Sequence, residues 1–213
     1  MVEIFEIQGS SLASPLDGQS VKTANNAVTA VGLDGFFVQT PSDRTDGDSE
    51  TSDGIFVFMG GPVPGIQIGD RVDVTGEVSE FFDFTEMSGD LLVEVAGSGP
   101  VPSPVVFDAS TPSPDPSLPS CATGIADIAD QLECFEGMLA EIVSGSVTGS
   151  NLQFSTDPIA EVRITAAARA FREPGVEFPG LVGLPVWDGN PEVFELDPDK
   201  LGLPNQIIPA GST

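Results

Sequence analysis

Residues 35–82 read GFFVQT (35–40), PSDRTDGDSETSDG (41–54), IFVFM (55–59) and, after a short break, GDRVDVTGEVSEFF (69–82). In the last segment Val72, Val74 and Val78 alternate with polar residues, which is the period-two pattern of a half-buried strand. Gly76, inside this pattern, indicates a bulge or bend. Two further strands are predicted at 20–31 and at LLVEV (91–95). Five strands in so short a stretch predict a small β-barrel.

The strand count is that of a Greek-key barrel of the OB type. A segment dense in Pro and Ser follows it and favours an extended connector in which VVFD (105–108) adds an edge strand. Beyond it, strand patterns recur at 135–147, 151–155 and 160–166. We therefore predict an all-β fold with two small β-barrel (OB-like) domains. The predicted parts are a first barrel (1–98), a Pro/Ser-rich linker (99–120) and a second β-rich, OB-like domain with an extended C-terminal arm (121–213).

The chain of 213 residues carries 33 acidic and seven basic residues, a net charge of −26. An apolar content of 40% with 14 Phe is sufficient for hydrophobic cores, so the acidity belongs to the surface of a folded protein. Such a surface repels phosphate backbones, and direct nucleic-acid binding is not expected without bridging cations. Strand phenylalanines are usually core residues. We favour that role, over the alternative of stacking platforms for nucleic-acid bases, for Phe36, Phe37, Phe56, Phe58, Phe81, Phe82 and Phe84.

Histidine is absent from the whole sequence. This excludes a histidine-dependent phosphodiesterase, a Ser-His-Asp hydrolase and a His-ligated zinc site within this chain. An enzyme acting through carboxylates alone needs two opposed acids in a cleft, and with 33 acids some pair qualifies by chance. The chain is therefore predicted not to be an enzyme. No apolar run approaches the length of a membrane span, and no membrane association is expected.

The predicted ligand site is the acidic loop at 41–54. Its five carboxylates lie within eleven residues, beside two glycines that permit tight turns. Calcium accepts carboxylate, carbonyl and water oxygens in flexible geometry, and a shared cation relieves the repulsion among clustered carboxylates. The spacing is not that of an EF-hand, and a solvated hairpin loop rich in turn-forming residues is the alternative. The predicted Ca²⁺ ligands are Asp43, Asp46, Asp48, Glu50 and Asp53.

Several segments together resemble the OB-fold accessory region of large secreted bacterial nucleases of the endonuclease/exonuclease/phosphatase class. The resemblance covers most of the chain and is carried by VEIFEIQG (2–9), SPLDGQSV (14–21), DGFFVQT with TSDGIFVF, GDRVDVTGEVSEFF, CFEGML (134–139) and the segment from REPG to GLPN (172–205). In that family the phosphodiesterase chemistry belongs to a downstream α/β domain that needs His and Asp around a metal. The resemblance therefore implies an accessory module without the catalytic domain.

It also implies an extracellular, secreted protein and a partner in the form of a downstream nuclease domain. Cys121 and Cys134 flank CATGIADIADQLEC, in which the spacing of Ile125, Ile128 and Leu132 favours one or two helical turns. Since disulfides persist in secreted proteins, the resemblance favours a disulfide here. Two free buried thiols, or a reduced cytosolic pair, are the alternative.

Two functions follow as expectations. The first is a non-catalytic extracellular accessory or binding module of a nuclease-like protein, stabilised by calcium. The alternative is a structural, self-assembling extracellular protein whose subunits join by strand addition. In that alternative the strand-like segment 2–8 and the C-terminal arm act as the joining elements.

Overall fold

The computed structural model describes residues 1–108, 110–111, 120–121, 128–149, 161–166, 193–197 and 212. The chain divides into two compact units. The first is made of Met1–Val105, Cys121–Ile125 and Leu132–Ala140; the second of Val106–Ser120, Ala126–Gln131 and Glu141–Thr213.

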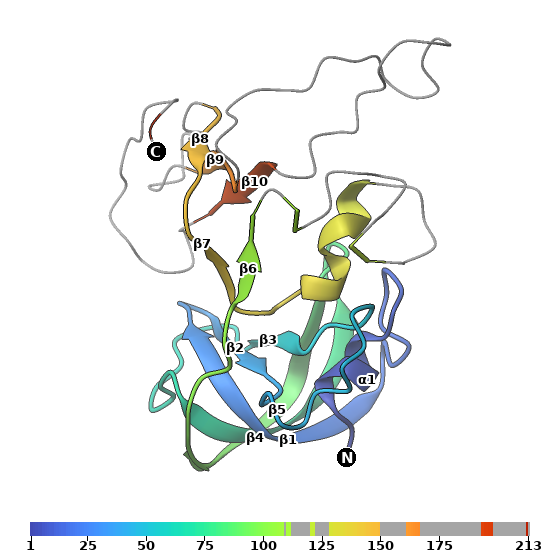
Figure 1. The fold of residues 1–213 in the computed structure, drawn as a ribbon. Helices are drawn as coiled ribbons and strands as arrows, with labels where there is room; N and C mark the ends of the chain where they lie inside the picture. The colour runs from blue at the N-terminus through green and yellow to red at the C-terminus, as the bar shows by residue number, and fades with distance from the viewer. Residues whose placement is uncertain are drawn as a thin grey trace. The chain divides into compact units, whose positions relative to one another are not determined.

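The first unit is built on five strands: β1 (Ser20–Val31), β2 (Gly35–Gln39), β3 (Gly54–Phe58), β4 (Asp70–Glu80) and β5 (Thr85–Ser98). They close into a barrel in the order β1-β2-β3-β5-β4 (Figure 1). All neighbouring strands are antiparallel except β3 and β5, which run parallel. The predicted all-β class is confirmed at this level, and every one of the five predicted strands is present.

The barrel core follows the alternation in the sequence. Val72, Val74 and Val78 of β4 are fully buried, as the period-two pattern predicts. Gly76 lies where the register between β4 and β5 shifts, which confirms the predicted bulge. The other fully buried core side chains come from β1, β2, β3, β5 and the N-terminal segment: Val28, Phe36, Val38, Ile55, Val57, Met87, Ile4 and Ile7.

The N-terminal segment is a helix, and the prediction of a strand at 2–8 is wrong. Helix α1 (Ile4–Gln8) begins where the Glu3 amide donates to the Glu6 carboxylate at 2.8 Å. Ile4 and Ile7 are three residues apart, so a helix places both on one face, and both are fully buried in the barrel core. A strand would have pointed them to opposite faces. The segment therefore belongs to the core of the barrel.

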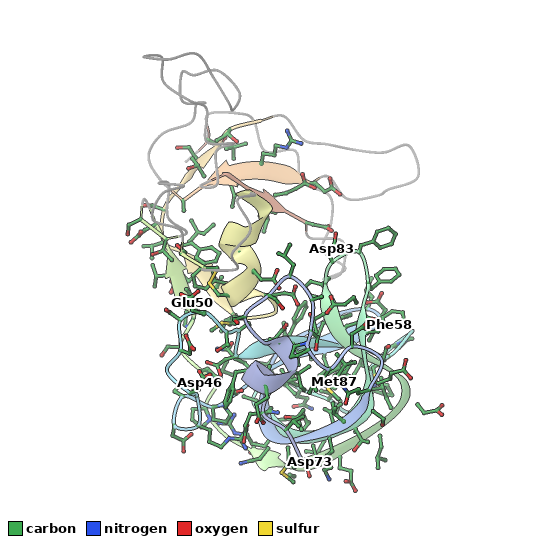
Figure 2. The ribbon with its side chains drawn as sticks, turned by 90° about the vertical axis from the view of Figure 1, so that its right-hand side faces the viewer. Asp46, Glu50, Phe58, Asp73, Asp83 and Met87 are labelled. Atoms are coloured by element: carbon green, nitrogen blue, oxygen red, sulfur yellow. A yellow bond between two sulfur atoms is a disulfide. The ribbon has the colours of Figure 1, made fainter. Side chains whose placement is uncertain are left out.

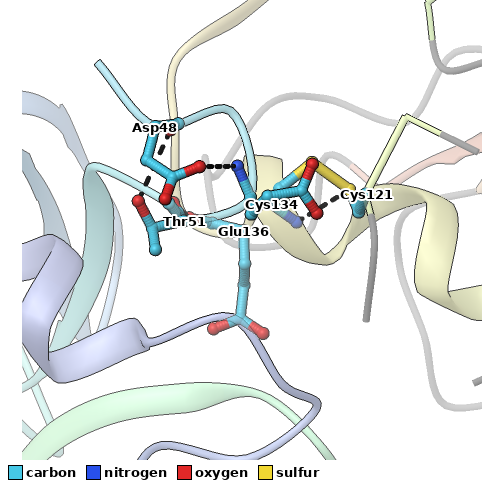
Figure 3. Close-up of a disulfide and its surroundings, with 7 residues drawn as sticks. Asp48, Thr51, Cys121, Cys134 and Glu136 are labelled. Carbon is cyan, nitrogen blue, oxygen red and sulfur yellow. Dashed lines mark hydrogen bonds between the residues drawn. A yellow bond between two sulfur atoms is a disulfide. The ribbon is translucent and has the colours of Figure 1, made fainter. Parts of the chain in front are cut away.

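A segment distant in sequence completes the first unit. Residues 132–140, which include the end of the 3₁₀ helix η1 (Ile128–Phe135), lie against β3 and the start of β5. The Ser52 hydroxyl donates to the Glu136 carbonyl at 2.5 Å, and the Leu139 amide donates to the Gln39 side chain at 3.0 Å. The Cys121–Cys134 disulfide is formed, as predicted (Figure 3). The helical turns expected between the cysteines are present as η1.

The remaining described strands are short. β6 (Val105–Phe107), the predicted edge strand, pairs with β7 (Ala140–Ile142). In the second unit β8 (Ser146–Val147), β9 (Val162–Thr165) and β10 (Val193–Leu196) form a three-stranded antiparallel sheet. The strand predicted at 151–155 and most of the 99–120 linker after residue 111 lie outside the described residues. The division at residues 98 and 120, and the second barrel, stay predictions.

Candidate functional site

Four phenylalanines lie on the outer surface of the barrel. Phe37 of β2 is directly opposite Phe56 of β3, and their ring centroids are 4.8 Å apart. The ring centroid of Phe56 is 6.3 Å from that of Phe84, which lies just before β5, and 6.5 Å from that of Phe58. They face outward because their strand neighbours Phe36, Ile55 and Val57 fill the core. The rings therefore form a continuous apolar surface across three segments.

This surface continues to the tip of the β4–β5 hairpin. The Phe81 and Phe84 amides and carbonyls exchange hydrogen bonds at 3.0 and 3.2 Å, so the two side chains project from the same face of the ribbon. Phe82 and Asp83 form the two-residue turn, with φ of 53° and 60°, the conformation of a type I′ turn. Asp83 lies at the tip of this hairpin (Figure 2). We call Phe37, Phe56, Phe58, Phe81, Phe82 and Phe84 together the aromatic face.

Half of the aromatic face is well exposed. Phe58, Phe81 and Phe82 expose 39%, 61% and 89% of their surface, and the other three rings are half-buried. The assignment of all these residues to the core is therefore wrong except for Phe36. The two-residue period of a strand could have predicted the exposed rings, because adjacent residues such as Phe36 and Phe37 point to opposite faces of the sheet. An exposed aromatic cluster of this kind on a barrel is typical of an interaction surface.

The segments that carry the aromatic face supply only negative charges. Residues 33–39, 54–60 and 79–90 contain no Lys or Arg. They contain five acids: Asp34, Glu80, Asp83, Glu86 and Asp90. Glu86 is the register neighbour of Phe56 on β5, on the same side of the sheet as Phe84, and it is 8% exposed. These segments thus combine exposed rings with acidic side chains and carry no basic ones.

The predicted calcium loop is ordered by its own carboxylates. Asp46 accepts hydrogen bonds from the Asp48 amide at 3.0 Å and from the Thr51 hydroxyl at 3.1 Å. Asp48 accepts one from the Glu50 amide at 3.0 Å (Figure 3). These are the local side-chain to backbone bonds that stabilise polar turns. Two of the predicted calcium ligands, Asp46 and Asp48, therefore already accept hydrogen bonds from groups within the loop.

Two of the five predicted ligands interact electrostatically. Burial, and then the nearby Asp46 carboxylate, raise the pKa of Asp53 to about 6. Arg44 of the same loop lies 3.4 Å from the Glu3 carboxylate and donates to the Ala24 carbonyl and the Asn26 side chain of β1. Within the described residues, which include the whole loop, no three acidic, Cys or His side chains are grouped closely enough to hold a metal ion. Calcium binding stays a prediction.

A half-buried carboxyl lies between the 132–140 segment and the barrel. Glu136 accepts hydrogen bonds from the Thr85 amide at 2.8 Å and from the Gln8 side chain at 3.3 Å. Burial is the main cause that raises the pKa of Glu136 to about 7, and the Glu133 and Glu80 carboxylates add to it. Its carboxylate points away from the disulfide (Figure 3). Sequence patterns could not indicate this group, because its desolvation depends on the packing of a distant segment.

Comparison of the chain with known protein families, with characterised proteins and with solved structures finds no match. No helix in the described part of the chain has the length and apolar character needed to span a membrane. The geometry of the first unit is thus the basis for a functional assignment.

Proposed function

We propose that this chain is a non-catalytic binding module whose barrel contacts its ligand through the aromatic face. The observation that carries the proposal is that Phe58, Phe81 and Phe82 are exposed on a barrel whose core is filled by other side chains. A five-stranded barrel of the OB type binds ligands on strands 2 and 3 and on the loop between strands 4 and 5. The aromatic face lies on these elements. The absence of histidine from the sequence supports a non-catalytic role.

The wider setting of the proposal is an extracellular accessory region beside a nuclease-like domain, with a second OB-like domain in the same chain. The disulfide supports an oxidising compartment. For the alternative, self-assembly by strand addition, the buried helix α1 removes the N-terminal strand that was expected to act as an arm. The closed barrel also leaves no free strand edge within β1–β5. We therefore favour the binding module.

Backbone amide NMR spectra of the full chain test the proposal. The probes are a single-stranded thymidine oligonucleotide, a neutral oligosaccharide, a neutral peptide and an arginine-rich peptide. We expect at least one probe to shift the amide signals of residues 35–37, 56–58 and 81–86 more than those elsewhere on the barrel. A spectrum in which no class of probe affects these residues would overturn the proposed function.

Calcium binding by the acidic loop has a separate test. Weak extracellular calcium sites have dissociation constants of about 1 mM. If the loop binds with this affinity, calcium at about 10 mM is expected to raise the melting temperature of the chain by about 4 °C. Asp46→Asn removes a predicted ligand and is expected to abolish the shift. The matched control is Asp90→Asn, which neutralises an exposed acid outside the loop. An equal shift in both variants, or an equal shift with sodium at the same ionic strength, would show charge screening and contradict a loop site.

A further inference from the structure

We propose that residues 132–140 form a pH-responsive strap, which the Glu136 side chain holds to the base of the β4–β5 hairpin and which is released when this carboxyl ionises beside Glu80. The strap joins the hairpin next to Phe84, so its release loosens the part of the aromatic face that the hairpin carries. Regulation of the face rests on the proposed function, whereas the strap itself is a property of the free chain.

Two acidic side chains bond to one residue at the base of this hairpin. Glu80 is the last residue of β4 and pairs with Thr85, the first residue of β5. The Glu80 carboxylate accepts a hydrogen bond from the Thr85 hydroxyl at 2.9 Å, and the Glu136 carboxylate accepts one from the Thr85 amide at 2.8 Å. Thr85 is 1% exposed, so these bonds are shielded from water at Thr85. The strap and the hairpin are thus joined at the residue that directly follows Phe84.

The surroundings of Glu136 oppose a negative charge on it. The charged groups that face it are two carboxylates, Glu80 of β4 and Glu133 of η1. Helix α1 contributes the uncharged Gln8, which donates to Glu136 at 3.3 Å. Neither Glu80 nor Glu136 forms an ion pair with any residue that the structure describes, and Oε2 of Glu80 is buried without a hydrogen-bond partner. A second negative charge at this place is therefore poorly hydrated and repelled.

Ionisation and release of the strap are linked. Desolvation, and then the neighbouring carboxylates, raise the pKa of Glu136 to about 7. In a released strap the carboxyl is hydrated, and its pKa returns toward the ordinary value of 4.5. Between these two values each pH unit favours the released state about tenfold. The free energy that holds the strap therefore decreases as the pH rises from about 4.5 to about 7, and it stays lower above that pH.

The contacts of the strap allow its middle to be released without unfolding the barrel. Cys134, near the start of the strap, is covalently bonded to Cys121, so a released strap stays tethered (Figure 3). Near its end the Leu139 amide donates to the Gln39 side chain at 3.0 Å. No side chain of residues 132–140 belongs to the hydrophobic core of the barrel. Release therefore breaks hydrogen bonds and a backbone contact but leaves the core intact.

Amide NMR of the free, full chain between about pH 5 and about pH 8.5 tests the strap. The signals of Thr85 and Glu136 are expected to shift with a midpoint near pH 7, and those of Phe81 and Phe84 are expected to follow. Hydrogen exchange measures the release itself. We expect the protection factors of the Phe84 and Leu139 amides, corrected for the direct effect of pH on exchange, to be at least about tenfold lower at the upper pH than at the lower.

Two variants separate the ionisation of Glu136 from general effects of pH. Glu136→Gln keeps a hydrogen-bond acceptor for the Thr85 amide and cannot ionise. Both protection factors are therefore expected to stay at their low-pH values throughout the titration. The matched control is Glu77→Gln, which removes an exposed acid from the strand that carries Glu80. This variant is expected to titrate and to lose protection as the unaltered chain does.

Titration of the Thr85 signal without loss of protection at Phe84 and Leu139 would overturn the inference, because the carboxyl would then ionise within a closed strap. An equal loss of protection in Glu136→Gln would also overturn it, since Glu136 would not be the cause. Loss at Leu139 with Phe84 unchanged would overturn the regulation of the face. Each of these failures leaves the proposed function standing, whereas a face that responds to none of the four probes overturns the proposed function and leaves the strap standing.

Discussion

The substitution Gly54→Ala is expected to lower the free energy of unfolding by about 3 kcal/mol, at the upper end of overpacking changes. A Cβ atom at residue 54 would lie 2.3 Å from the carbonyl carbon of Gly137 and 2.4 Å from the Met138 amide nitrogen. These are backbone atoms, which cannot rotate away as a side chain can. Gly137, in the turn after η1, has a φ of +67° and a similar approach to Ile55, so the contact depends on the absence of a side chain at both glycines. The 132–140 segment is expected to separate from β3.

Urea unfolding and amide hydrogen exchange measure this effect. Exchange of the Leu139 amide, which donates to Gln39, is expected to become faster in Gly54→Ala, because its partner is lost when the segment separates. The control is Gly61→Ala in the β3–β4 loop, where a Cβ atom has no neighbour within 4 Å and φ is not positive. We expect the control to be within about 0.5 kcal/mol of the unaltered chain. Equal stability of the two variants would contradict the packing of residues 132–140 on the barrel.

Glu136→Gln is expected to raise the free energy of unfolding by about 2 kcal/mol at pH 8 and to leave it nearly unchanged at pH 5. The pKa of Glu136 is about 7 in the folded protein, against 4.5 for the unperturbed group. Between these values the folded state keeps a proton that the unfolded chain has released. Stability therefore falls as the pH rises from about 4.5 to about 7, and is not regained above it. Glutamine resembles the protonated acid and does not titrate, so the variant loses this slope.

Urea unfolding from pH 4.5 to 8.5 gives the difference between variant and unaltered chain at each pH. The Thr85 amide and the Gln8 side chain can still donate to the glutamine oxygen, which preserves the local hydrogen bonds. Glu77→Gln is the matched control, since Glu77 is exposed on β4. It is expected to change stability by less than about 0.5 kcal/mol at every pH. A pH-independent difference for Glu136→Gln would contradict a carboxyl whose pKa is raised by desolvation at this position.

The barrel strands could be predicted from the sequence because their pattern is local. Alternation placed Val72, Val74 and Val78 inward, and Gly76 marked the bulge. The helix at Ile4–Gln8 was missed because a short apolar segment has no distinct period of its own, and the tertiary core selected the helix. The hairpin turn was missed because Phe-Asp is not a preferred turn sequence, so the strand was extended to Phe82.

The candidate site could be predicted only in part. The phenylalanines were identified as a group, but their core role was inferred from the average tendency of Phe to be buried. The alternation of side chains along a strand, which places Phe37 and Phe56 on the outer surface, was not applied to them. The approach of Gly54 to Gly137 joins residues far apart in the sequence and leaves no local pattern. The raised pKa of Glu136 depends on that same packing. Long-range contact, rather than composition, therefore determines both features.

Ligand binding through the aromatic face of the barrel is tested most directly by the amide NMR survey of the full chain. We predict that at least one of the four probes shifts the signals of residues 35–37, 56–58 and 81–86, and that Phe82→Asn, which removes the most exposed ring of the face, weakens this response. Shifts spread evenly over the acidic surface, or confined to residues 41–54, would contradict it.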